Sequence, residues 1–459
     1  MTSAKFRATL LAILFIIAPT TRAATHTNVI ILLADDLGYA DIGCQAIEKD
    51  VKTPNIDSIA AAGVRFTSAY VSCPVCSPSR AGILTGKYQE RFGHEANPLP
   101  EYDKTFGLPT NQITLADEFR RSGYATAAFG KWHEGDNEKF WPLKRGFDEF
   151  FGFLGGMHAY VPRPIESQGV NVIRRGNNPV EEKEYLTDAI TREAVSFIDR
   201  HRDKPFFMYV AYNAVHVPQQ APPRYLKRFP EDTDKSRRLM LAMLAAEDDG
   251  VGKILTKLHD EKLDNDTLVI FLSDNGGPTW ENASRNAPLR GFKGQVWEGG
   301  IRIPFMMKWP GKIPAAKVIN QPIISLDIFP TALTAAGATP RNPKDIDGKN
   351  ILPLVTGIAD APPHPTLYWR FKPQWAIRDG NYKLETARDG ITHLYDLSKD
   401  ESEQNDLMKS HPEIAANLQK KYDAWNATLM NPLWPGRQEG ANAQAAAKID
   451  QQESTADAD

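Results

Sequence analysis

The chain has 459 residues, long enough for a large core and too long for one small domain, so we expect a main domain with a smaller one. Aromatic residues make up 10% of the sequence and charged residues 24%, as in folded enzymes. The formal net charge of -3 gives no reason to expect nucleic acid as a partner. The three cysteines are too few for a disulfide scaffold, and their number is odd.

The N-terminus has the pattern of an export signal. Lys5 and Arg7 precede an apolar run over residues 10–18, and the small residue Ala23 suits cleavage. A membrane anchor is the alternative, but the run is far shorter than the ~20 residues that span a bilayer. We therefore predict a signal peptide over residues 1–23, export to the periplasm or outside the cell, and no stable membrane insertion.

Strand-like and helix-like segments alternate over the first two thirds of the chain. Apolar runs typical of buried strands cover residues 28–34, 64–66, 125–129, 205–211, 268–272 and 303–308. Helix-like segments lie between them at residues 56–62, 115–122 and 239–258. This alternation predicts a doubly wound α/β fold, with a mostly parallel sheet flanked by helices and function at the carboxyl ends of the strands.

The pattern changes near the C-terminus. Short alternating runs separated by turn signals occur at residues 367–371, 375–378, 382–385 and 392–397. They predict a small antiparallel sheet, closed by an amphipathic helix over residues 412–429. We therefore expect a catalytic domain at 24–355, a C-terminal subdomain at 356–435 and a disordered tail at 436–459.

Polar side chains follow two of the predicted strands. Asp35 and Asp36 come directly after residues 28–34, and Asp274 and Asn275 follow a later apolar run. An isolated Asp pair is more often a solvated turn, but two parallel strands would bring three carboxylates and one amide to the same edge. Such oxygen ligands suit a hard cation, Ca²⁺ or Mg²⁺, better than zinc.

A cysteine motif lies at residues 76–80 (Cys-Ser-Pro-Ser-Arg), in a segment expected to be a loop. Residues 81–86 (Ala-Gly-Ile-Leu-Thr-Gly) can then form a helical turn whose amide N–H groups favour an anion. The string C-x-P-x-R followed by x-x-x-L-T-G resembles the hallmark of the formylglycine-dependent sulfatase family, within the alkaline-phosphatase-like superfamily. By this resemblance Cys76 is the residue that is modified.

A redox dithiol is the competing interpretation, because Cys73 and Cys76 also form C-x-x-C. It would leave the matches at Arg80 and at residues 84–86 unexplained. Cys73 is then structural or free, and the sequence leaves the role of Cys44 open.

The resemblance extends over most of the chain. Residues 28–38 resemble the family's opening strand and metal loop, residues 130–133 its G-K-W-H motif, and residues 289–293 with 298–304 its late lysine motif. The segment Leu-Tyr-Asp-Leu at residues 394–397 also fits. One departure is Glu134, where the family often has leucine.

Carried over residue by residue, the resemblance implies a sulfuric ester hydrolase. One Ca²⁺ would be bound by Asp35, Asp36, Asp274, Asn275 and the modified Cys76. Arg80 would orient the formylglycine hydrate, and Lys131 and Lys293 would hold sulfate oxygens. His133 would serve the hydrate, and His216 would lie near the leaving oxygen, where it or Lys293 can protonate the leaving group.

The resemblance also implies a maturation step. A formylglycine-generating enzyme would oxidise Cys76 to 3-oxoalanine, whose hydrate offers one hydroxyl for attack on sulfur and a second through which sulfate is expelled. A serine would lack this route, because its sulfate ester would have to be hydrolysed.

Several residues between the motifs are candidates for substrate contacts. Trp132, Trp141, Trp280 and Trp297 flank the motifs and could stack on sugar rings, but we expect each to be a core residue. His158, Tyr160 and the pair Arg174-Arg175 lie where substrate loops are expected, and a solvated face is the simpler interpretation of the arginines.

Three alternatives to a sulfatase acting on a sulfated polysaccharide or oligosaccharide stay open. An arylsulfatase of broad specificity and a phosphate or phosphonate monoester hydrolase of the same superfamily would both use this fold and anion site. A non-catalytic protein that binds sulfated glycans, with Cys76 never oxidised, is of another class, and the retained Lys131, His133, His216 and Lys293 weigh against it.

Overall fold

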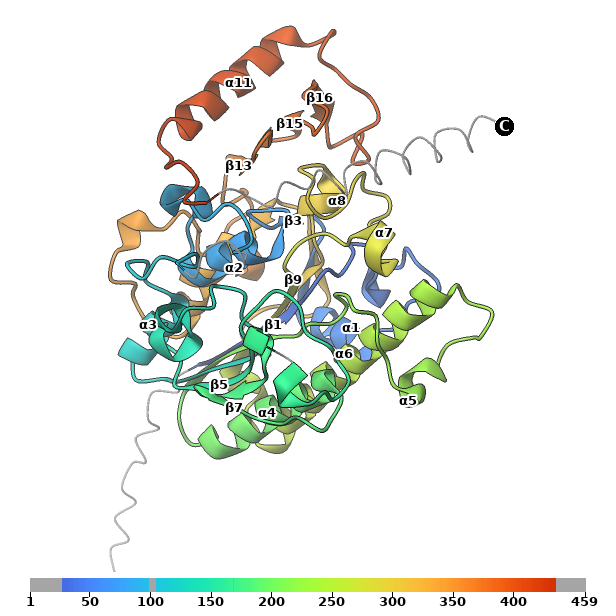
Figure 1. Ribbon diagram of the computed structural model, residues 1–459. Coiled ribbons are helices and arrows are strands. Elements are labelled where there is room, and N and C mark those ends of the chain that lie inside the picture. Colours follow the sequence, from blue (N-terminus) through green and yellow to red (C-terminus); the bar gives the residue numbers. More distant parts are fainter. Residues whose placement is uncertain (1–26, 99–104, 168, 435–459) are drawn as a thin grey trace, which may run out of the picture.

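The computed structural model describes residues 27–98, 105–167 and 169–434 (Figure 1). The predicted signal peptide and tail lie outside these residues, so export and the proposed domain boundaries stay predictions. None of the helices within the described ranges has the length and apolar character needed to cross a membrane.

A ten-stranded sheet forms the centre of the molecule, in the order β11-β2-β10-β9-β1-β8-β4-β5-β6-β7. In chain order its strands are β1 (Asn28–Ala34), β2 (Val64–Phe66), β4 (Ala125–Lys131), β5 (Glu149–Phe153), β6 (Arg174–Arg175), β7 (Asn178–Pro179), β8 (Phe206–Ala211), β9 (Thr267–Ser273), β10 (Phe305–Lys308) and β11 (Lys317–Ile319). β1 runs parallel to β8 and β9, whereas β10 runs antiparallel between β9 and β2. The predicted doubly wound, mostly parallel sheet is confirmed.

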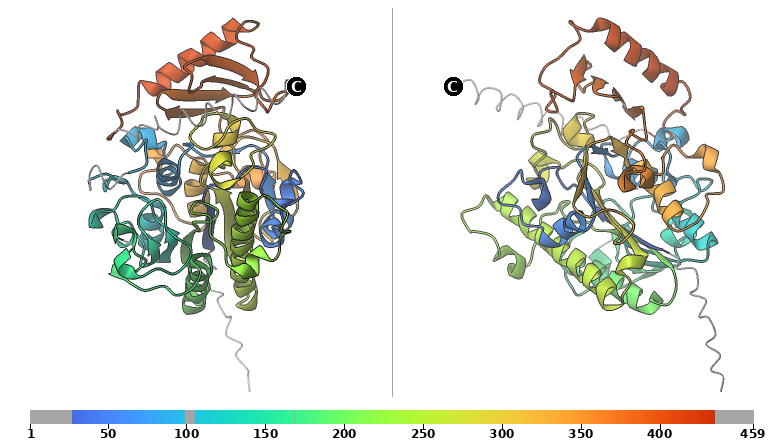
Figure 2. Two further views of the ribbon diagram at one scale, coloured as in Figure 1. Left: turned by 45° about the vertical axis from the view of Figure 1, so that its right-hand side comes forward. Right: turned by 180° about the vertical axis from the view of Figure 1, so that it is seen from behind.

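Helices cover both faces of this sheet (Figure 2). On one face lie α1 (Pro54–Ala61), α4 (Leu186–His201) and α6 (Lys235–Asp260). On the other lie α2 (Cys76–Thr85), α3 (Leu115–Arg121) and α9 (Ile328–Ala335). Successive side chains of a strand point to opposite faces, so Val29 and Ile31 join one core and Ile30 and Leu32 the other. Burial on both faces is why the strand is apolar throughout.

A four-stranded antiparallel sheet lies above the main domain in Figure 1, as predicted. It consists of β13 (Thr366–Phe371), β14 (Gln374–Asp379), β15 (Tyr382–Thr386) and β16 (Thr392–Asp396), with α11 (Pro412–Asn426) packed on it. The small sheet shares a core with the main domain. Trp369 packs on Tyr70, and its Nε1 donates to the carbonyl of Val71 at 2.7 Å.

Gly130 is required where β4 reaches the site, one residue before Lys131. Its φ is +102°, and a Cβ there would lie 1.9 Å from the carbonyl oxygen of Ala211 on β8. We expect Gly130→Ala to lower the free energy of unfolding by at least about 1–3 kcal/mol, the cost of an unfavourable φ. Gly123→Ala is the matched control in urea denaturation, because φ is +85° there but no atom lies within 4 Å. Equal losses of unfolding free energy in Gly130→Ala and Gly123→Ala would show that contact with the Ala211 carbonyl adds no cost.

Candidate active site

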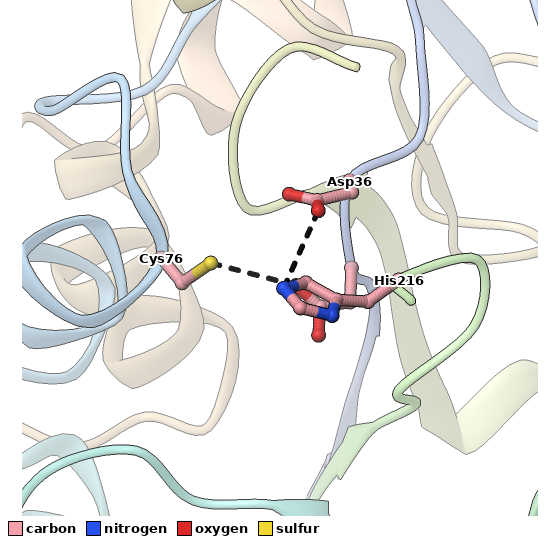
Figure 3. A group of neighbouring side chains, drawn as sticks. Asp36, Cys76 and His216 are labelled. Atoms are coloured by element: carbon pink, nitrogen blue, oxygen red, sulfur yellow. Dashed lines mark hydrogen bonds and ion pairs between the residues drawn. The ribbon is translucent and has the colours of Figure 1, made fainter. Parts of the chain in front are cut away.

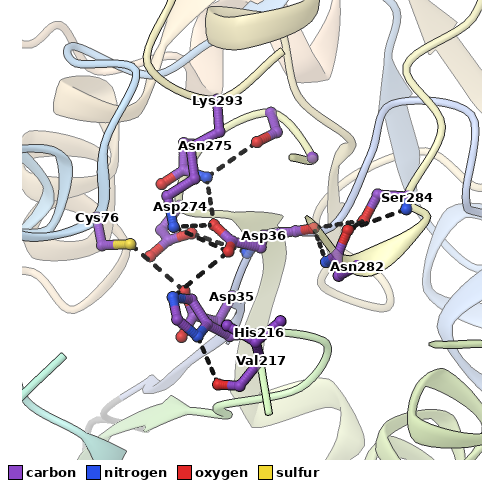
Figure 4. A network of polar contacts seen from close by, with 12 residues as sticks. Asp35, Asp36, Cys76, His216, Val217, Asp274, Asn275, Asn282, Ser284 and Lys293 are labelled. Carbon is purple, nitrogen blue, oxygen red and sulfur yellow. Dashed lines mark hydrogen bonds and ion pairs between the residues drawn. The ribbon is translucent and has the colours of Figure 1, made fainter. Parts of the chain in front are cut away.

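The two acidic strand ends meet at one edge of the sheet. Ala34 and Ser273 are partners in the parallel register of β1 and β9, so the residues that follow them are neighbours. The amide of Asp36 donates to Asp274 Oδ1 at 3.2 Å, and Asn275 Nδ2 donates to Asp36 Oδ1 at 2.7 Å (Figure 4). The three carboxylates and one amide therefore lie together, as the strand pattern predicts.

Asp36 lies in the left-handed region with φ 64°, which few residues other than glycine adopt. Its carbonyl accepts hydrogen bonds from Ser284 Oγ at 2.9 Å and from Asn282 Nδ2 at 3.3 Å. These two residues hold the turn that aims the Asp36 carboxylate into the site. Sequence reasoning missed them, because they lie in a segment with no motif or periodicity to mark them.

The expectation that residues 76–80 form a loop is wrong, because α2 begins at Cys76 itself. Val75 is extended before it, and Gly86 ends the helix with φ 67°. Pro78 is compatible with this start, since the amides of the first helical turn have no partner within the helix. Cys76 Sγ consequently lies at the positive end of α2, 3.6 Å from Asp35 Oδ1.

The thiol of Cys76 is a poor nucleophile in its unmodified form. Burial, only partly offset by Lys131 and Lys293, raises its pKa to about 12. Burial also raises the pKa of Cys73 well above its usual value, and the structure has Cys44, Cys73 and Cys76 as free thiols. A redox dithiol needs an accessible thiol of low pKa, so this environment argues against that alternative.

Arg80 is fully buried and fixes the back of the site. Its Nε donates to Asp274 Oδ2 at 2.9 Å, Nη2 forms an ion pair with the same oxygen at 2.8 Å, and Nη1 donates to the carbonyl of Lys131 at 3.0 Å. Nη2 also lies 3.6 Å from Asp35 Oδ1. One guanidinium thus connects α2, β4 and the end of β9.

Two lysines each pair with a different strand-end carboxylate. Lys131 Nζ lies 2.6 Å from Asp35 Oδ2, and Lys293 Nζ lies 2.7 Å from Asp36 Oδ1. Burial raises the pKa of Asp35 to about 7 in spite of Lys131. Burial would also raise the pKa of Asp36, but Lys293 and then His216 outweigh it and hold that pKa below its usual value.

Both predicted histidines lie in the site. His216 Nε2 is 3.5 Å from Asp36 Oδ2, and its Nδ1 is 2.8 Å from the carbonyl of Val217. Burial and then Lys293 lower the pKa of His216 to about 3. Burial and then Lys131 lower the pKa of His133 well below its usual value. Both imidazoles are therefore neutral at pH 7.

The donor atoms fit a hard divalent cation. Ligand atoms of Asp35, Asp36, Cys76 and His216 all lie within 4.8 Å of one another, and Figure 3 shows the last three converging from separate segments. Asn275 Oδ1 is buried and has no hydrogen-bond partner among the described residues, so it is free to act as a ligand. The carboxylate and amide oxygens of this set suit Ca²⁺, whereas the Cys76 sulfur and the His216 nitrogen are softer ligands.

Glu134 is a buried acid close to α2, the helix that begins at Cys76. Its Oε2 lies 3.8 Å from His94 Nε2, which in turn lies 2.7 Å from Ser77 Oγ. Burial raises the pKa of Glu134 well above its usual value, which favours the uncharged carboxyl. The departure from leucine therefore places a buried polar group beside His94.

The expectation that all four tryptophans are core residues is wrong for one of them. Trp132 and Trp297 are buried, and Trp141 packs against the core beneath the guanidinium of Arg174. Trp280 is 46% exposed on α7 (Thr279–Asn282). Thr279 beside it is exposed as well, whereas Asn282 at the other end of this short helix is buried.

The site combines a sheet edge with acidic strand ends, a helix that begins at a buried Cys-x-Pro-x-Arg motif, and two lysines. Together these features define a hydrolase of anionic esters. Comparison with known proteins identifies the family within this class. The family model described as Sulfatase matches residues 27–338, and a second, described as N-sulphoglucosamine sulphohydrolase, C-terminal, matches residues 292–427. The chain belongs to the formylglycine-dependent sulfatase family and is a sulfatase.

Relatives and solved structures agree with this assignment. N-acetylgalactosamine-6-sulfatase of Canis lupus familiaris is 34% identical over 377 residues, which cover 78% of this chain and 71% of that one. Human steryl-sulfatase is 30% identical over 452 residues, covering 79% and 75%. The crystal structure of Ps i-CgsB is 35% identical, with a TM-score of 0.86 and coverage of 92% and 98%. The same protein has been solved in complex with k-i-k-neocarrahexaose.

Proposed function

We propose that this sulfatase removes sulfate from a sulfated polysaccharide or oligosaccharide, with formylglycine at Cys76 as nucleophile and one bound Ca²⁺. The observation that carries the proposal is the position of Cys76. It lies at the start of α2 beside Asp35, within a site where Lys131 and Lys293 pair with separate carboxylates. The proposal includes export and a maturation enzyme that oxidises Cys76.

A carbohydrate substrate is supported by two observations. The relatives include an N-acetylgalactosamine-6-sulfatase and a structure that binds an oligosaccharide. On this chain, the exposed indole of Trp280 lies on α7, whose Asn282 side chain bonds to the carbonyl of Asp36. An exposed aromatic face next to an anion site suits a sugar ring.

The cofactors supply what the side chains lack. Ca²⁺, when bound, would offset negative charge on the sulfuryl oxygens and favour ionisation of the attacking hydroxyl. Three cations (Arg80, Lys131 and Lys293) balance three carboxylates (Asp35, Asp36 and Asp274). A divalent ion among them would make the site net positive, which suits a sulfate ester.

The side chains have separate tasks in the reaction. Arg80 is held by Asp274 and orients the nucleophile, and Lys131 attracts the sulfuryl oxygens. Lys293, which stays protonated next to Asp36, gives a proton to the leaving oxygen. The neutral imidazole of His133 accepts a proton when sulfate is released.

Rates on matched sulfate and phosphate monoesters test the proposed reaction. We expect faster turnover of sulfate, and faster turnover of phosphate would instead assign the phosphate or phosphonate hydrolase. Comparable turnover of aryl and sugar sulfates would favour the arylsulfatase of broad specificity. Mass spectrometry of the Cys76 peptide from the native host tests maturation, and an unmodified thiol throughout would leave the glycan-binding alternative.

Calcium is expected to stabilise the protein more at pH 8 than at pH 6. Burial raises the pKa of Asp35 to about 7, so below that pH a proton competes with the ion, and affinity should fall about tenfold per pH unit. Without the ion, the folded protein loses stability as pH rises from about 4 to 7. The unfolded chain releases the Asp35 proton at about pH 4, whereas the folded protein keeps it up to about pH 7. At 100 times its Kd, Ca²⁺ adds about 2.7 kcal/mol, which a melting curve with and without chelator measures.

Asp35→Asn is the control, because an amide keeps the shape of the side chain and does not titrate. The variant should bind Ca²⁺ more weakly and with a flatter pH dependence between pH 6 and 8. A calcium effect that is unchanged by pH in the parent protein would show that Asp35 does not compete with the ion.

A further inference from the structure

Lys293 lies in an irregular segment, residues 289–297, between α7 and α8 (Glu298–Ile301). This segment is termed the lysine loop. Neither a helix nor a strand within it fixes the position of the ammonium group. The amide of Gly294 donates to the carbonyl of Pro74 at 2.9 Å, which ties the loop to the chain two residues before Cys76. Other groups must fix its remaining polar atoms.

Gln374, at the start of β14 in the C-terminal sheet, forms two hydrogen bonds with this loop. Its side chain is buried, Nε2 donates to the carbonyl of Gly294 at 2.8 Å, and Oε1 accepts from the amide of Val296 at 3.4 Å. One amide side chain thus binds backbone groups on both sides of Gln295. Through Gly294, the contacts run from the C-terminal sheet past Lys293 to Pro74.

Lys383 on β15 adds a second, charged contact to the same loop. Its fully buried Nζ donates to the carbonyl of Val296 at 2.8 Å, and lies 2.6 to 3.2 Å from carboxylates of Glu403, Glu298 and Glu385. An apolar side chain would fill this space without the cost of burying charge. The Lys383 ammonium group instead holds the backbone carbonyl of Val296, three residues from Lys293.

We propose that Gln374, supported by Lys383, is a positioning residue for Lys293, so that the C-terminal sheet sets where the ammonium group lies in the site. This inference rests on the proposed role of Lys293 in sulfate-ester hydrolysis. Displacement of a catalytic group by about 1 Å can cost about 100-fold in rate. The sheet is therefore part of the catalytic apparatus although neither residue touches the proposed site residues directly.

A double-mutant cycle tests this inference. Gln374→Ala should lower kcat on a sugar sulfate by about 10- to 100-fold with little change in KM, with rates expressed per mole of modified Cys76. In a Lys293→Ala background the same substitution should have almost no further effect. Gln374→Glu keeps the acceptor for Val296 but sets a second acceptor against the carbonyl of Gly294, so its loss should be at least as large as that of Gln374→Ala. Independent, additive losses from Gln374→Ala and Lys293→Ala would overturn the inference.

Trp369→Phe is the matched control, because it removes a buried hydrogen bond between the same sheet and the main domain without touching the lysine loop. Its kcat should stay within about twofold of the parent. Equal loss in Trp369→Phe and Gln374→Ala would reduce Gln374 to a general structural role and overturn the inference.

Hydrogen exchange separates this inference from the proposed function. Amides at residues 292–296 should exchange faster in Gln374→Ala and at the parent rate in Trp369→Phe. If the parent protein hydrolyses no sulfate ester, the proposed function fails, whereas faster exchange would still support positioning of the loop by Gln374. Unchanged exchange in Gln374→Ala overturns the inference whatever the activity.

Discussion

Replacing Cys76 with alanine is expected to lower kcat on sulfate esters by about 10⁴-fold or more while the fold stays intact. The loss is this large because the substitution removes the precursor of the nucleophile, and enzymes lose activity on this scale when the nucleophile is removed. The fold should persist because alanine favours the helix that begins at this position. Steady-state rates and far-UV circular dichroism measure the two effects.

Cys73→Ala is the matched control, since Cys73 is a second buried free thiol three residues away. It should keep parental activity. Because burial raises the pKa of the unmodified Cys76 thiol to about 12, activity in any preparation should also scale with the modified fraction. Activity that survives in Cys76→Ala, or that falls equally in Cys73→Ala, would reject Cys76 as the nucleophile's source.

The sequence predicts those parts of the fold and site whose signal is local. β1 and β9 are recognisable as continuous apolar runs, and the acidic residues at their ends follow from parallel pairing. β5 and α4 were not predicted. β5 contains Gly152, which weakens a strand pattern, and α4 lacks a side-chain cap at its start.

The remaining features depend on contacts between distant segments. Gln374 lies 80 residues from Gly294, and Asn282 lies 246 residues from Asp36, so no spacing rule connects them. The left-handed turn at Asp36 is fixed by those contacts and not by its own preference. The sequence pattern predicts the start of α2 too late, because the proline in the motif is typical of a loop. The first turn of a helix nevertheless accepts proline.

Replacing Lys293 with alanine is expected to slow hydrolysis of a sugar sulfate far more than hydrolysis of 4-nitrophenyl sulfate. Burial would lower the pKa of Lys293, but Asp36 at 2.7 Å outweighs it, so the group carries a proton at neutral pH. A general acid contributes about 10²–10⁴-fold, and a nitrophenolate can leave without one. kcat/KM should therefore fall by about 10²–10⁴-fold on the sugar sulfate and only a few-fold on the aryl ester.

His216→Ala is the control, because burial and then Lys293 lower the pKa of His216 to about 3 and leave it no proton to give. Its loss should be the same on both substrates. Burial, the larger cause of that low pKa, persists in Lys293→Ala, so His216 should not replace the lysine as acid there. Equal losses on both esters for Lys293→Ala would leave that lysine an anion-binding group only.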